Sequence, residues 1–132
     1  MTARSGTATP MQKLEEAMPN GKIVPVVITY DPKGKTAKDI IAVSEEPFLV
    51  SKGNCEQVKW ICVNKDHSQA APKFTIDFRG KYGSPFYESQ FSDEVPFSGL
   101  VRREVLPYEQ KIYEYTIRIG KTLLDPGGGV KA

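Results

Sequence analysis

Few residues in this sequence could carry chemistry at neutral pH, and the first of them is its single histidine. His67 stands between Asp66 and Ser68, so the three residue types of a hydrolytic triad are adjacent in the chain. A triad is assembled from separate segments whose side chains point at one another, which three consecutive residues cannot do. We therefore interpret His67 as a solvated loop histidine. A single imidazole also excludes every site that needs two.

The two cysteines, Cys55 and Cys62, are the other candidates for reactive side chains. They lie seven residues apart in a stretch that reads as extended. At ~3.3 Å per residue their Cα atoms would be about 20 Å apart, whereas a disulfide needs about 7 Å or less. We expect two unpaired thiols, with Cys62 in the core and Cys55 near a turn. A thiol-dependent redox protein that uses Cys55 stays open as one functional hypothesis.

The carboxylates form no arrangement that points to catalysis or metal binding. Glu45 is next to Glu46 and Asp93 is next to Glu94, which is typical of solvated turns. Nothing fixes the separation of two carboxylates that a glycosidase needs, and no run of alternating oxygen ligands suggests calcium. We assign no catalytic, cofactor-binding or metal-binding residue. We expect a protein that is not an enzyme and holds no cofactor.

The charge of the chain is nearly balanced. Its 18 Lys and Arg residues against 16 Asp and Glu residues give a formal net charge of +2 at pH 7. This balance provides no electrostatic footprint for nucleic acid or an acidic membrane, and we expect neither as a partner. The longest apolar run, residues 23–28, is far below the roughly 20 residues that span a bilayer. With no signal-peptide pattern either, we expect a soluble, cytoplasmic protein.

An aromatic cluster between two predicted strands is the candidate interaction surface. Its members lie within residues 82–97 and are Tyr82, Phe86, Tyr87, Phe91 and Phe97. Exposed aromatic rings give rigid contact area to a protein partner or to a second copy of the chain. They also provide stacking platforms for sugars, so a carbohydrate-binding module that uses Tyr82 and Tyr87 is the alternative. Phe86, Phe91 and Phe97 could instead pin a long crossover to the core.

The segments that position these residues have the sequence patterns of β-strands. Apolar and polar residues alternate through residues 57–63, 73–78 and 111–119, which indicates strands that cover a single core. Two further strands, over residues 22–30 and 35–43, flank a turn at 31–34 and predict a hairpin. Pro25 lacks an amide donor and places the first of them at an edge or a bulge.

Shorter strands over residues 48–50 and 100–106 bring the count to seven or eight, with no interleaved helices. This pattern predicts an all-β fold, namely an antiparallel Greek-key β-sandwich of the cupredoxin-like or immunoglobulin-like kind. We expect the sandwich domain over residues 21–124.

The two ends of the chain lack the sequence pattern of the predicted strands. Residues 1–20 predict a flexible N-terminal arm with a short helix near 10–18. Thr9 would cap this helix, and its apolar face would consist of Met11, Leu14 and Met18. Residues 125–132 contain three consecutive glycines, and we expect a flexible tail there.

The order of several short motifs resembles the strand pattern of cupredoxin-like domains over residues 44–119. The motifs lie at residues 47–53, 58–60, 74–78, 98–99 and 113–117. Type 1 copper in that family needs two imidazoles and a thiolate, and the thiolate and second histidine follow the late tyrosine strand. Residues 118–130 contain no Cys, His or Met. The resemblance therefore implies a cupredoxin-like fold without copper. We expect a non-catalytic binding or structural module that contacts other proteins through the 82–97 segment or the edge strand near Pro25.

Overall fold

The computed structural model describes residues 22–132, so the predicted N-terminal arm and its helix lie outside the described residues. The described chain is mostly β, which confirms the predicted all-β class. Its elements in chain order are β1 (Lys22–Tyr30), α2 (Ala37–Ile40), β2 (Ile41–Val43), β3 (Phe48–Ser51), β4 (Glu56–Asn64), β5 (Thr75–Asp77), β6 (Gln90–Ser92), the 3-10 helix η1 (Pro107–Glu109), β7 (Tyr113–Glu114), β8 (Thr116–Ile119), β9 (Thr122–Leu124) and β10 (Gly127–Lys131).

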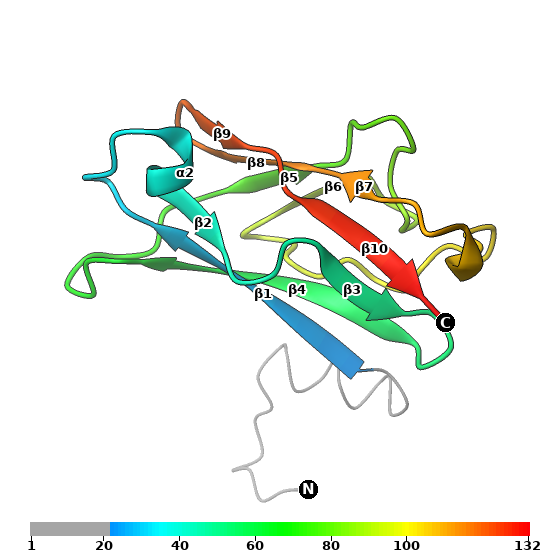
Figure 1. Cartoon of the computed structure of the whole chain (residues 1–132). Helices are drawn as coiled ribbons and strands as arrows, with labels where there is room; N and C mark the ends of the chain where they lie inside the picture. Colours follow the sequence, from blue (N-terminus) through cyan, green and yellow to red (C-terminus); the bar gives the residue numbers. More distant parts are fainter. Residues whose placement is uncertain (1–21) are drawn as a thin grey trace, which may run out of the picture.

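The strands form three small sheets, with the orders β2-β1-β4, β3-β10-β7 and β6-β5-β8-β9 (Figure 1). All pairs in the third sheet are antiparallel, as predicted. The prediction is wrong for two pairs, because β1 runs parallel to β4 and β10 runs parallel to β3. The β1–β4 pair extends over nine registered positions. Alternation along one strand shows which side chains are buried, but not the direction of its neighbour.

The predicted hairpin after β1 forms in a shortened version. The amide of Gly34 donates to the carbonyl of Asp31 at 3.1 Å and closes the predicted turn. The chain then makes α2, whose Asp39 amide donates to the Thr36 side chain at 3.3 Å. Because residues 37–40 are helical, only β2 remains to pair with the last three residues of β1. Among residues 22–132, the first half of β1, where Pro25 lies, consequently has β4 as its only strand neighbour.

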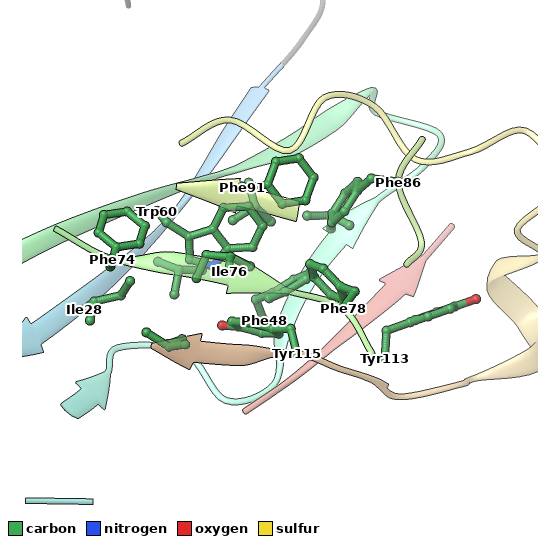
Figure 2. Packing of buried hydrophobic residues seen from close by; sticks show 14 of the residues in the cluster. Ile28, Phe48, Trp60, Phe74, Ile76, Phe78, Phe86, Phe91, Tyr113 and Tyr115 are labelled. Atoms are coloured by element: carbon green, nitrogen blue, oxygen red, sulfur yellow. The ribbon is translucent and has the colours of Figure 1, made fainter. Parts of the chain in front are cut away.

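The core lies between the inner faces of β1 and β4 and those of β5 and β8, where the predicted alternation holds. Trp60 of β4, Ile76 of β5 and Ile117 of β8 are all buried. The Trp60 ring stacks on Phe91 at 5.2 Å between centroids and meets Tyr115 at 5.8 Å (Figure 2). Such aromatic pairs add about 0.5–1.5 kcal/mol each beyond their buried area.

Phe48 of β3 is the ring that joins the sheets. It contacts Trp60 at 6.2 Å and Phe86 at 6.2 Å between ring centroids. Its contact with Tyr115, at 5.7 Å, reaches the segment that leads into β8. Phe48 is completely buried, and its position in Figure 2 is at the centre of the labelled rings. The packing of the core therefore depends on room for this ring.

That room comes from β10, where the expectation of a flexible tail is wrong. Residues 127–131 form a strand in which only the last is exposed. A Cβ atom at Gly128 would overlap the Phe48 ring, and one at Gly127 would lie 2.7 Å from Cγ2 of Ile112. The three glycines resemble a linker in composition, but Gly128 is the position where the Phe48 ring meets the main chain too closely for a side chain, and a Cβ at Gly129 would lie 3.0 Å from Cδ2 of Leu49.

We expect Gly128→Ala to destabilise the fold by about 2–3 kcal/mol, because overpacking a rigid core forces ring and backbone shifts. Thermal unfolding measured by circular dichroism would show the lowered midpoint. Gly53→Ala is the matched control, since a Cβ there would have its nearest neighbour at an ordinary 3.6 Å. Equal midpoints for the two variants would contradict the packing described for Gly128.

Two buried polar atoms in this core have no hydrogen-bond partner among the described residues. They are the indole nitrogen of Trp60 and the hydroxyl of Tyr115. Burial raises the pKa of Tyr115, and the neighbouring Trp60 indole partly offsets this effect, although the two groups do not meet the geometry of a hydrogen bond. A buried hydroxyl without a partner costs about 1–3 kcal/mol of desolvation free energy.

We therefore expect Tyr115→Phe to leave the free energy of unfolding unchanged or to raise it by about 1 kcal/mol. Urea denaturation followed by Trp60 fluorescence is the measurement. Phe78→Leu provides a control for disturbance of the same ring cluster. A loss of 1 kcal/mol or more in Tyr115→Phe would mean that the hydroxyl has a partner in solution.

Candidate functional site

The five aromatic residues of the predicted surface separate into core and surface positions. Phe86 and Phe91 are buried, and their rings lie 6.2 Å apart in an edge contact. They hold the crossover against the core, which confirms the pinning interpretation for these two. Phe97 is half-buried, and the ammonium group of Lys59 lies 5.3 Å from its ring centroid.

Tyr82 is exposed, but its ring already has neighbours. The ammonium groups of Lys81 and Lys111 lie over it, 5.4 and 5.2 Å from the centroid. Tyr113 meets it in an edge contact at 6.1 Å. A sugar ring would have to displace a lysine to stack on Tyr82, so this residue is a poor carbohydrate platform.

Tyr87 is the one predicted residue with a largely exposed ring among the five. Its hydroxyl accepts a hydrogen bond from the amide of Arg103 at 3.0 Å. This bond ties the loop of Tyr87 to the segment that leads into η1. The predicted residues thus do not form one surface, because each exposed ring stands in different surroundings.

An apolar groove that the sequence did not reveal lies between η1 and the outer face of β10. Its volume is about 430 Å³. Three large hydrophobic side chains line it while remaining open to solvent: Tyr108 is 77% exposed, Leu49 50% and Ile112 49%. Isolated exposed hydrophobic residues are ordinary, but several around one groove mark an interaction site.

Local structure explains how these side chains reach the groove. Pro107 begins η1, and Gln110 ends it in the left-handed region with φ 56°. The chain then crosses the outer face of β10, where Ile112 covers Gly127. Leu49 points outward from β3 because its neighbours Phe48 and Val50 are buried. The residues come from three distant parts of the chain, so no local pattern could have identified them.

The charged side chains that line the groove are those of Lys111 and Lys131. Lys111 pairs with Glu109, with its Nζ 2.8 Å from the carboxylate, and this hydrogen bond raises the pKa of the lysine. Lys131 also lines the groove, is exposed, and forms no ion pair within residues 22–132. Apart from these charged side chains, the large residues of the lining are mostly apolar.

The residues that could have carried chemistry lie apart from the groove. Asp66 accepts hydrogen bonds from the hydroxyl and the amide of Ser68, at 2.6 and 3.0 Å, which lowers the pKa of its carboxyl group. The Ser68 hydroxyl thus donates to the carboxylate, and His67 is exposed beside it. No group of three or more His, Cys, Asp or Glu side chains in residues 22–132 is placed to hold a metal ion.

The two cysteines are free thiols, as predicted. Cys55 is exposed in the turn before β4, with φ 56°. Cys62 is half-buried, and burial, with a smaller effect from the Asp93 carboxylate, raises its pKa to about 11. A thiol with such a raised pKa is a weak nucleophile at neutral pH, since the thiolate is the reactive form.

Comparison with known proteins gave no relative. No protein family, no curated protein and no solved structure matches this chain. Among residues 22–132 no helix has the length and apolarity to cross a membrane. The site must therefore be interpreted from its own geometry.

We expect iodoacetamide to alkylate Cys62 slowly at pH 8, because a pKa of about 11 leaves about one thiol in a thousand ionised. The rate at Cys62 should rise about tenfold per pH unit up to about pH 11. Mass spectrometry of the Cys55→Ser variant isolates this reaction. Fast alkylation of Cys62 at pH 7, in folded protein, would contradict the environment described.

Proposed function

We propose that this chain is a non-catalytic protein-binding module and that the groove between η1 and β10 is its binding site. The observation that carries the proposal is the convergence of Tyr108, Leu49 and Ile112, all exposed, on that groove. Aromatic anchors of this kind dominate the energy of protein interfaces, where truncation of a central Tyr costs 2 kcal/mol or more.

We also propose that the fold is a cupredoxin-like or immunoglobulin-like Greek-key β-sandwich without copper. Supporting this, Trp60 of β4 packs on Phe78, the residue that directly follows β5, with their ring centroids 6.1 Å apart. The chain after β8 has no residue type that binds type 1 copper. In this proposal the β-sandwich serves as a scaffold for a binding site on its surface.

The groove is a better candidate than the predicted segment 82–97. Two of the five aromatic residues there belong to the core, and Tyr82 lies under two lysines. The groove instead combines free apolar side chains with a rigid floor, because Gly129 and Val130 belong to a buried strand. Rigid floors lower the entropy cost of binding. The partner that we propose is another protein chain or a second copy.

We expect a photo-reactive benzoylphenylalanine in place of Tyr108 to cross-link the full-length chain to a polypeptide in its native cells. The same group in place of Val95, an exposed residue of a different region, is the matched control and should give no such adduct. Electrophoresis and mass spectrometry would detect the adduct.

The dependence on the groove is tested by Leu49→Glu, which places a charge on an exposed position of its lining. We expect this second change to abolish the adduct at position 108 while thermal unfolding stays within a few degrees. Equal cross-linking from positions 108 and 95, or an adduct that survives Leu49→Glu, would contradict a binding site in the groove.

A further inference from the structure

The edge of β10 beside the groove is only partly used. On one side β10 pairs with β3 through four positions, from Gly128 to Lys131. On the other side it pairs with β7 at Gly127 and Gly128 alone. Figure 1 shows β7 leaving β10 well before the end of that strand. The last part of β10 therefore has an edge without a neighbouring strand in the described chain.

The main chain of Val130 faces this edge. In a strand, successive residues direct their N–H and C=O groups to opposite sides. The carbonyl of Lys131 accepts from the amide of Lys52 on the β3 side, whereas the carbonyl of Pro126 accepts from Tyr115 on the β7 side. Val130 lies four residues, an even number, after Pro126. Its N–H and C=O groups therefore point to the same side as the Pro126 carbonyl, which is the β7 side.

No partner for these two groups is found within residues 22–132. Backbone N–H and C=O groups in proteins are almost always paired, with other protein groups or with water, so these two are available to a strand that enters the groove. Val130 also lines the groove, while its side chain belongs to the core. The atoms that it presents to the groove are therefore main-chain atoms.

The reason that β7 ends early lies in the residues after η1. An antiparallel continuation of β7 would place Lys111 opposite Val130. The carbonyl of Lys111 instead approaches Gly129, 3.9 Å from where its Cβ would be, and Ile112 covers Gly127. The chain thus passes over the face of β10 and not along its edge. This path gives the groove its wall and leaves the edge at Val130 open.

We propose that a partner peptide binds here in extended form, as a strand added to β10 with an acidic side chain toward Lys131. This inference rests on the proposed function and names its partner class. In strand addition, main-chain hydrogen bonds, here to Val130, provide affinity, and pockets for every second side chain of the peptide provide specificity. Tyr108, Leu49 and Ile112 provide the apolar pocket.

Charge complementarity selects this occupant over a second copy. Lys131 lines the groove without an ion pair in the described chain, whereas Lys111 beside it is already paired with Glu109. Two copies paired edge to edge around Val130 would bring their own Lys131 side chains near each other, which is unfavourable. An acidic peptide places opposite charges there instead, and such complementarity determines specificity and association rate.

The experiment uses the full chain and a phage-displayed library of random ten-residue peptides. We expect the selected peptides to alternate apolar and polar residues and to be enriched in Asp and Glu. Binding of a selected peptide should weaken at least tenfold in Tyr108→Ala and in Lys131→Glu. Val95→Ala, a truncation at an exposed site elsewhere, is the matched control and should leave affinity unchanged.

Amide hydrogen exchange of Val130 distinguishes a peptide that adds a strand to β10 from a peptide that binds in the groove without main-chain hydrogen bonds. We expect the exchange rate to fall at least tenfold when a selected peptide saturates the protein, as an N–H gains a partner. Peptides that need Tyr108 but leave this rate unchanged overturn strand addition and leave the proposed function standing.

Three other results overturn the inference. They are selection of peptides rich in Lys and Arg, protection of Val130 by dimerisation of the chain alone, and a library that yields no binder dependent on Tyr108. If, in addition, the cross-link at position 108 proves independent of Leu49, the proposed function fails as well.

Discussion

The Phe48 ring packs directly against the main chain of Gly128, and the other parts of the structure are arranged around this contact. Phe48 touches Trp60 and Tyr115, so its position determines how the rings of different sheets meet. A Cβ at residue 128 would occupy the space of the ring. Close packing of protein interiors leaves no room to accommodate such an overlap without strain. The glycines of β10 are therefore a condition for the aromatic core.

The same glycine strand shapes the surface on its other side. Ile112 and Leu49 lie close over Gly127 and Gly129, because no side chain separates them from the main chain. The segment after η1 can consequently cross the face of β10 and leave its edge. A groove with an apolar lining and an open strand edge is the result. This geometry supports the proposed binding of another chain, since it offers apolar contact area and main-chain hydrogen-bonding groups.

The sequence predicted what depends on local alternation. The strands around Trp60, Ile76 and Tyr115 have the predicted inward faces, because period two follows from the backbone itself. The glycine strand was missed, since its reason is a ring 80 residues away in the chain, at Phe48. Parallel pairing and the groove at Tyr108 were missed for the same reason: both depend on which distant segments become neighbours. Phe86 and Tyr87 show the limit most plainly, as adjacent aromatic residues with opposite burial.

A double-mutant cycle between Phe48 and Gly128 tests the central contact most directly. The free energy of unfolding would be measured for the original chain, Phe48→Leu, Gly128→Ala and the double variant. We expect the alanine to cost much less when the smaller leucine is present, with a coupling free energy of about 1–2 kcal/mol. Costs that add to within about 0.5 kcal/mol would show that the two residues do not depend on each other, and would contradict the role given to this contact.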